Sequence, residues 1–306
     1  MISPMEQETD VADRRTGGHF LSEAEAQRFW RDGFVGPFTL YEPDHMLELW
    51  GRLRMDLLDR RRAPFPQSRL NYDRHLDVKE LSDIISHPKI VHRLQSILGR
   101  DLLCWRSEWF PKYPGDGGTE WHQAKTFVEF EEHARLEPTR SPSALWGLTV
   151  WTAFTESTRA NGCMKMLPGT HNAWFFDETR SVKFDPAGEH NRNDKGKDAG
   201  FFGYNWDKLK LDPSWTPDES RAVYLEMKPG QFFLFSSQCL HGADPNNSKT
   251  MRCGWSARYV QTHVKVYPGY DTINALGEVL PLDRYSTVLV GGEDTYGHNK
   301  LRRPLS

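Results

Sequence analysis

The stretch AVYLEMKPGQFFLFSS, residues 222–237, decides the fold expected for this chain. This run is rich in aromatic and β-branched residues, and Pro and Gly interrupt it, as is typical of strands and the turns between them. Four more runs have this texture: DLLCWRSEWFPKY (101–113), SALWGLTVWTAFT (143–155), GCMKMLPGTHNAWFF (162–176) and MRCGWSARYVQTHVKVY (251–267). Short strands with turn residues between them predict a β sandwich or barrel after Arg100.

The first hundred residues predict helices instead. The expected helices lie within residues 21–38, 42–64 and 81–99. The first begins at the capping residue Ser22 and ends at Gly33, and the third is kinked or broken at Pro88. The second ends in the arginines 60–62, which we interpret as a solvated C-terminal end favoured by the helix dipole.

The fold class that follows is α+β, with a double-stranded β-helix (a jelly-roll, cupin-like core) flanked by N-terminal helices. Residues 1–19 are polar and predict a disordered N-terminal segment. Residues 20–306 are expected to form one catalytic domain, with its helical part at 20–100. The polar segment 181–214 is an expected excursion or lid, because strands resume on both sides of it.

Composition narrows the class of protein further. The 306 residues are 38% hydrophobic and carry a net charge of −3, which gives no electrostatic reason to expect a nucleic acid or membrane partner. No apolar run approaches the ~18 residues that span a bilayer, and the N-terminus lacks the apolar segment of a secretory signal. The cysteines form no CxxC pair and predict buried free thiols in a cytoplasmic protein: Cys104, Cys163, Cys239 and Cys253.

The stretch TEWHQAKTF, residues 119–127, contains half of a familiar iron site. Non-haem Fe(II) enzymes use two histidines and one carboxylate, and the carboxylate commonly lies two residues after the first histidine. Here Ala124 stands two residues after His122. A second histidine, His241, ends the run FLFSSQCLH, and Arg252 follows eleven residues later, where the 2-oxoglutarate-dependent class has the arginine that binds its cosubstrate. A lone histidine is more often structural than a ligand, so the combination carries the argument.

On these residues the chain resembles the phytanoyl-CoA dioxygenase superfamily, and within it the iron- and 2-oxoglutarate-dependent aliphatic halogenases, nearest those that act on threonyl groups. The motifs GFVGPF, NYDRHLD, WFPKYPGDGGTEWHQA, VWTAFTESTRANGC, GFFGY, KPGQFFLF and SARYV carry the resemblance over residues 20–290. In these halogenases an alanine or glycine replaces the carboxylate, and chloride takes its place on iron. The resemblance therefore implies Fe(II), 2-oxoglutarate, chloride and O2 as cofactors.

Charge balance supports this interpretation. A carboxylate and a chloride ion each bring one negative charge to the metal, so the exchange conserves the charge of the centre. The methyl group of Ala124 supplies no ligand and leaves room for a halide. We therefore expect an intact site with an exchanged ligand.

The resemblance also assigns roles to eleven residues. The implied iron ligands are His122 and His241. The residues implied to hold the C5 carboxylate of 2-oxoglutarate are Arg252, Thr119 and Trp151. Those of the chloride pocket are Ala124, Phe127 and Ser237. The implied catalytic network beside the chloride consists of Arg258, Glu108 and Thr149, together with Ala124. The planar arginine fork suits a carboxylate for geometric reasons.

The substrate implied is an aminoacyl group tethered to a carrier (thiolation) protein. Lys125 and Lys165 stand where that family has Asp and Gln, which leaves open a free anionic substrate such as a nucleotide, nucleoside or amino acid. A hydroxylase remains open if Glu120 shares the face of His122 on a regular strand and supplies the third ligand. A catalytically dead binding module is the last alternative. Glu129 replaces an Asn of the family network, and we expect it to point away from the site.

Overall fold

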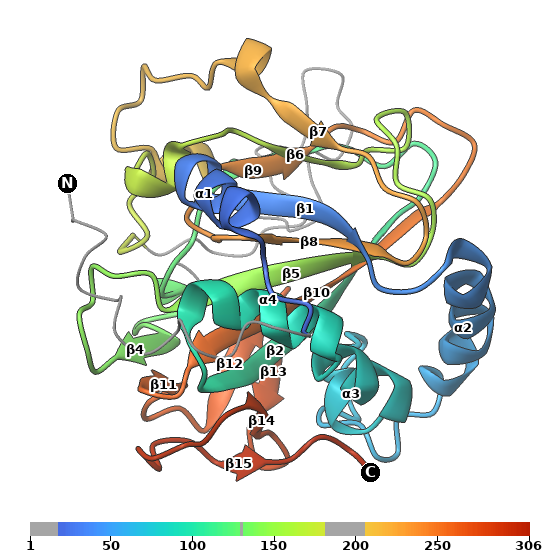
Figure 1. Cartoon of the computed structure of the whole chain (residues 1–306), viewed down its shortest axis with the longest axis vertical. Coiled ribbons are helices and arrows are strands. Elements are labelled where there is room, and N and C mark those ends of the chain that lie inside the picture. The colour runs from blue at the N-terminus through green and yellow to red at the C-terminus, as the bar shows by residue number, and fades with distance from the viewer. Residues whose placement is uncertain (1–17, 129–130, 181–205) are drawn as a thin grey trace.

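The computed structural model of the chain describes residues 18–128, 131–180 and 206–306 (Figure 1). Its centre is a seven-stranded sheet. In sheet order the strands are β1 (Phe34–Thr39), β8 (Gln231–Phe235), β5 (Gly147–Ala153), β10 (Arg252–Gln261), β2 (Leu102–Lys112), β14 (Thr287–Gly291) and β15 (Leu301–Arg302). The strand pairs are antiparallel except β14–β15, as expected for a jelly roll.

A smaller four-stranded sheet lies across from the first (Figure 1). Its strands are, in order, β3 (Thr119–His122), β9 (His241–Ala243), β6 (Met164–Met166) and β7 (Val223–Leu225). Two short pairs complete the β structure: β4 (Leu136–Pro138) with β11 (Val264–Val266), and β12 (Thr272–Ala275) with β13 (Glu278–Pro281). The α+β class with a jelly-roll core is thereby confirmed.

Helices of the N-terminal part cover one side of the large sheet. They are α1 (Glu23–Asp32), α2 (Pro43–Asp56), α3 (Lys79–Ile85) and α4 (Pro88–Leu98). Ser22 forms the predicted cap with Glu25, and Gly33 ends α1 in the left-handed conformation at φ 87°. The predicted break at Pro88 separates α3 from α4. One continuous apolar core joins these helices to the large sheet.

The second helix is shorter than predicted, because α2 ends at Asp56. The buried guanidinium of Arg74 donates to the carbonyl groups of Leu57 at 2.9 Å and Asp59 at 2.8 Å. These bonds replace the hydrogen bonds that further helical turns would provide. The arginines 60–62 therefore lie in the following loop, and their assignment to a helix end was wrong.

All four cysteines are buried and free, as predicted. Within the residues described, no helix has the length and apolar character needed to cross a membrane. The expected disordered segment falls outside the described residues up to position 17, as does the excursion between 181 and 205. The described end of that excursion forms a short 3-10 helix, η6 (Trp206–Leu209).

Candidate active site

A single cavity between the two sheets collects all eleven predicted site residues. Its volume is about 1100 Å³ with the open mouth included, which is large enough for a small-molecule site. The smaller sheet and the loop after β3 contribute Thr119, His122, Ala124, Phe127 and His241. The large sheet and the turn after β8 contribute Glu108, Thr149, Trp151, Ser237, Arg252 and Arg258.

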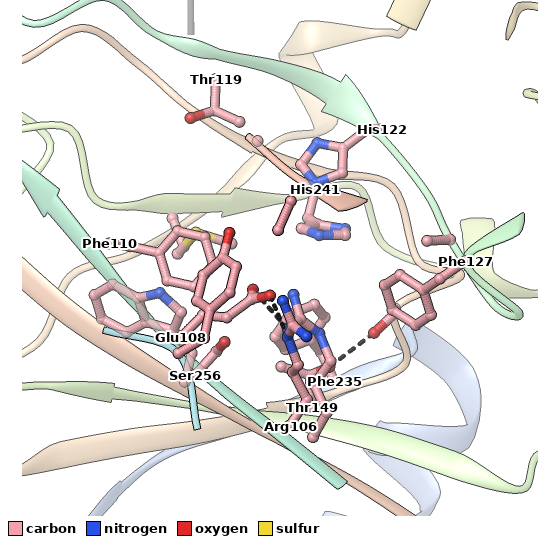
Figure 2. A pocket seen from close by; sticks show the side chains of 18 of the residues that line it. Arg106, Glu108, Phe110, Thr119, His122, Phe127, Thr149, Phe235, His241 and Ser256 are labelled. Carbon is pink, nitrogen blue, oxygen red and sulfur yellow. Dashed lines mark hydrogen bonds and ion pairs between the residues drawn. The ribbon is translucent and has the colours of Figure 1, made fainter. Parts of the chain in front are cut away.

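The two histidines face each other at one side of this cavity (Figure 2). His122 and His241 are directly opposite in the β3–β9 ladder, and their ring centroids are 4.1 Å apart. Each ring donates its Nδ1 hydrogen to the carbonyl two residues earlier, Glu120 or Cys239, at 2.8 Å. This assigns the lone pair to Nε2, the form that binds a metal. Burial lowers the pKa of His122 to about 4 and that of His241 well below its usual value.

The loop after β3 fixes the position of Ala124. The buried amide of Gln123 donates to the carbonyl groups of Ala173 at 3.1 Å and Gln238 at 2.7 Å. The backbone N–H of Ala124 donates to the carbonyl of Ser237 at 2.9 Å. Ala124 is 4% exposed, so its methyl group faces the cavity rather than bulk water. The hydrogen bonds of Gln123 thus hold in place the loop segment that carries His122 and Ala124.

Glu120 does not complete a metal site. The β3–β9 pairing shifts register between Thr119 and His122, so the regular strand that this alternative required is absent. The Glu120 side chain is not among the cavity-lining residues. Burial, with Asp207 nearby, raises its pKa to about 7. In the part of the chain that the structure describes, no three His, Cys, Asp or Glu side chains are placed to bind one metal ion.

A buried charge network lies across the cavity from the histidines (Figure 2). Glu108 accepts hydrogen bonds from Arg258 at 2.6 Å and Arg106 at 2.9 Å. Burial disfavours the charged carboxylate, but the two arginines hold the pKa of Glu108 at about 2. Arg106 also donates to the Tyr267 hydroxyl at 2.8 Å. The buried carboxylate of Asp73 lies 3.9 Å from Arg106, and burial raises its pKa to about 6. The network therefore keeps two arginines and the Glu108 carboxylate charged beside the site.

Replacing Glu108 by Gln is expected to lower the free energy of unfolding by about 3–5 kcal/mol at pH 7, because the buried Arg258 loses its carboxylate partner and Arg106 keeps only the Asp73 carboxylate, at 3.9 Å. The pKa of Glu108 is depressed in the folded state, so its contribution is complete above pH ~4.5 and is lost as the pH falls toward 2. Urea unfolding at pH 7 and pH 3 measures both effects. The exposed pair Glu137–Lys265 supplies the control, since Glu137→Gln should cost less than about 1 kcal/mol. Equal losses in the two variants would contradict this prediction.

The predicted chloride pocket forms one wall of the cavity. The hydroxyl groups of Thr149 and Ser237 are 2.7 Å apart and hydrogen-bonded to each other. The Phe127 and Trp105 rings form a T-shaped pair with centroids 5.5 Å apart, and the Arg258 guanidinium lies 5.3 Å from the centroid of the Phe127 ring. This wall therefore combines two small hydroxyl groups with a guanidinium group, both of which can interact favourably with an anion.

The other end of the cavity suits a carboxylate. Arg252 is 3% exposed, its guanidinium lies 5.3 Å from the Trp151 ring, and its Nε has no hydrogen-bond partner. The indole N–H of Trp151 and the hydroxyl of Ser256 are also buried without partners. Gly254 makes room for this ring, because an added Cβ would lie 1.8 Å from a Trp151 ring atom. Several buried donors without acceptors indicate a site for an anionic ligand.

Sequence reasoning missed several residues of this cavity. Arg106 and Lys112 line it and are 1% and 3% exposed. Both share a face of β2 with Glu108, because alternate residues of a strand point to the same side. The alternation along this strand could have predicted that Arg106 and Lys112 face the same side as Glu108. Trp206 stacks on His122 with ring centroids 4.8 Å apart. It follows the quoted motif GFFGY by two positions, but that motif did not indicate a contact with His122.

The two lysines that raised the possibility of an anionic substrate do not line the cavity. Lys165 is 8% exposed and forms ion pairs with Asp244 at 2.9 Å and Glu219 at 3.1 Å. Lys125 is half-buried outside the cavity. Neither side chain is fully exposed to solvent. Glu129 lies outside the described residues.

The sequence of this chain matches a known protein family and several curated proteins. The family described as phytanoyl-CoA dioxygenase (PhyH) matches residues 29–254. The chain is 30% identical over 112 residues to a phytanoyl-CoA dioxygenase domain-containing protein 1 homolog of Dictyostelium discoideum, covering 37% of this chain and 34% of that one. It is 26% identical over 178 residues to a probable alpha-ketoglutarate-dependent hypophosphite dioxygenase of Stutzerimonas stutzeri, covering 58% and 52%. The chain thus spans about a third to a half of these relatives.

Similarity to solved structures extends over more of the chain. The structure of CytC3 with Fe(II) and alpha-ketoglutarate, another name for 2-oxoglutarate, superimposes with a TM-score of 0.73. Its sequence is 38% identical, and the match covers 94% of both chains. The non-haem monooxygenase ThoJ in complex with Ni shares the fold at 23% identity and a TM-score of 0.61.

Proposed function

Because the chain belongs to the phytanoyl-CoA dioxygenase family of non-haem iron, 2-oxoglutarate-dependent oxygenases, we propose that it is an aliphatic halogenase. It would chlorinate an unactivated C–H carbon, with Fe(II), 2-oxoglutarate, O2 and chloride. Residues 20–306 would act as one catalytic domain, since a continuous core joins the helices to the large sheet.

The observation that carries this proposal is the pair His122–His241 beside the methyl group of Ala124. Two neutral imidazoles with assigned tautomers fit a ferrous ion. No described carboxylate joins them, and the small alanine leaves the adjacent position to an external anion. A chloride there restores the negative charge that a carboxylate would have brought.

Iron, O2 and 2-oxoglutarate, when bound, supply the oxidising power that removes hydrogen from an aliphatic carbon. The chain's own residues determine what is held where. His122 and His241 hold the metal, Arg252 with Thr119 and Trp151 orients the cosubstrate through its C5 carboxylate, and Ala124, Phe127 and Ser237 surround the halide. The network of Glu108 and its arginines fixes charge around the halide and restricts water. Positioning decides whether the target carbon meets chlorine or oxygen.

For the substrate we propose an aminoacyl group tethered to a carrier protein through phosphopantetheine. The lysines that favoured a free anion do not line the cavity. Of the cavity's cations, Arg106 and Arg258 are already paired with Glu108. Arg135, which also lines the cavity, is paired with Glu131 at 2.9 Å. The other two buried cations, Lys112 and Arg252, lie at the cosubstrate end.

The test presents the iron-loaded protein with chloride, 2-oxoglutarate and O2. One set of reactions contains threonyl, valyl and leucyl groups loaded on a carrier protein, and a second contains the free amino acids and nucleotides. Mass spectrometry follows the exchange of one hydrogen for one chlorine. Chlorination only on the carrier supports the proposal, and chlorination of a free compound would replace the substrate class. Products that contain added oxygen but never chlorine would overturn the halogenase.

Replacing Arg252 by Ala is expected to weaken 2-oxoglutarate binding by about 2–5 kcal/mol, because the C5 carboxylate would be buried without its cationic partner. Isothermal titration of the anaerobic Fe(II) protein measures the affinity. The matched control is Arg100→Ala, which removes an exposed arginine that pairs only with surface carboxylates. An unchanged affinity in Arg252→Ala would remove this residue from the cosubstrate site.

A further inference from the structure

Two buried cations lie next to each other at the cosubstrate end of the cavity. Lys112 and Arg252 are direct partners across the β2–β10 ladder, and each side chain belongs to a residue only 3% exposed. Both line the cavity together with Thr119. Burying two like charges side by side is unfavourable unless an anion lies between or beside them.

No described carboxylate neutralises this pair. The ammonium group of Lys112 donates to the backbone carbonyl of Asp244 at 2.8 Å. The Asp244 carboxylate itself is engaged by Lys165 at 2.9 Å and by the Tyr224 hydroxyl at 2.9 Å. Arg252 reaches only a backbone carbonyl, at 3.4 Å, and its Nε stays without a partner. The two cations thus have fewer anionic contacts than their burial requires.

The surroundings determine the protonation of Lys112. Burial first, and then Arg252, lower the pKa of Lys112 to about 7. Asp116 in the turn after β2, Asp244 after β9 and the thiol of Cys163 before β6 act in the opposite direction. Without a ligand, the amine is therefore divided between its charged and neutral forms near neutral pH.

We propose that Lys112 is a second binding residue for the C5 carboxylate of 2-oxoglutarate, beside Arg252, and that the cosubstrate binds together with a proton taken up at Lys112. This inference rests on the proposed function, since it requires the C5 carboxylate to lie at this end of the cavity. An anion beside the amine stabilises the ammonium form, so binding raises the affinity of Lys112 for a proton.

The affinity for 2-oxoglutarate should depend on pH through Lys112. Below pH 7 most of the free protein already carries the ammonium form, so binding of 2-oxoglutarate takes up few protons. Above pH 7 the free amine is mostly neutral and must gain a proton when the anion binds. The affinity for 2-oxoglutarate therefore falls as the pH rises above 7, by at most about tenfold per pH unit.

The experiment is isothermal titration of the anaerobic Fe(II) protein with 2-oxoglutarate in buffers of different ionisation enthalpy. The dependence of the heat on the buffer gives the number of protons taken up. We expect about half a proton at pH 7 and closer to one at pH 8. Lys112→Met should bind more than about tenfold more weakly, without uptake. Lys112→Arg, which is charged at every pH used, should retain affinity without uptake.

The control variant is Lys89→Met, because Lys89 also donates to a backbone carbonyl, that of Leu40 at 2.9 Å, but does not line the cavity. It should bind and take up protons like the unaltered protein. Circular dichroism and thermal unfolding show that each variant is folded. Uptake that persists in Lys112→Met and Lys112→Arg, or heats independent of the buffer, would overturn this inference and leave the proposed function intact. Failure of the unaltered protein to bind 2-oxoglutarate at any pH would instead overturn the proposed function.

Discussion

Replacing Ala124 by Asp is expected to abolish chlorination. The new carboxylate would project from a backbone held by the carbonyl of Ser237, beside the two histidines and into the space assigned to the halide. A covalently attached carboxylate has a high effective concentration at the metal, so it excludes chloride at any practical chloride concentration. The product ion that carries chlorine should disappear from mass spectra, whether or not a hydroxylated product replaces it.

The matched control is Ala124→Asn, which has nearly the shape of Asp without its charge. If chloride is excluded by charge and ligation, chloride should still raise iron affinity in the Asn variant but not in the Asp variant. If steric bulk alone acts, the two variants should lose this chloride effect equally. Chlorination by Ala124→Asp at the full rate would refute the position assigned to the halide.

The fold could be predicted from the sequence because each level of pattern agreed with the next. Aromatic and β-branched runs bounded by Pro-Gly turns specify strands, and the runs beginning at Ser143 and Met251 became the adjacent central strands β5 and β10. The end of α2 could not be predicted in this way. It depends on Arg74, which lies 18 positions beyond the last helical residue. The Arg74 side chain donates hydrogen bonds to the carbonyl groups that follow the helix. Local propensity contains no information about such a contact.

The residues of the candidate site divide in the same way into those that local motifs predict and those that only the tertiary fold brings together. All eleven residues assigned by resemblance converge on one cavity, although they come from strands of both sheets and from the loops after β3 and β8. The resemblance could assign only residues that the family's motifs contain. Lys112 lies inside the quoted motif WFPKYPG, yet its importance comes from pairing with Arg252, which is 140 positions later. Trp206 reaches His122 only through the tertiary fold.

One geometric feature explains why Glu120 was a reasonable but unsuccessful candidate. On a regular strand, residues two apart share a face. The register shift in β3 breaks this rule between Thr119 and His122, and it brings both into the cavity while Glu120 stays outside. The same irregularity therefore presents His122 to the proposed metal position and keeps the carboxylate two residues before it in the sequence away from that position. A metal centre with an exchangeable anion depends on both effects.

Removing either imidazole is expected to eliminate iron binding and turnover. In the proposed site the described chain would supply only two metal ligands, so His122→Ala or His241→Ala would retain one. Changes to residues that merely orient metal ligands cost about 10–100-fold in affinity, and loss of a ligand should cost more than about 100-fold. Metal content after loading with Fe(II) and desalting measures this directly, independently of substrate.

The control for these variants is His171→Ala, since His171 is also largely buried but does not line the cavity. It should retain full iron content even if its thermal stability falls. The two site variants should show the opposite pattern: little loss of stability without metal, and no stabilisation when Fe(II) is added. Burial of His122 and His241 favours neutral rings that lack a counter-charge, so their removal should not destabilise the metal-free fold strongly. Iron content equal to that of the unaltered protein in either variant would exclude that histidine as a ligand, and the halide position defined by it would have to be abandoned as well.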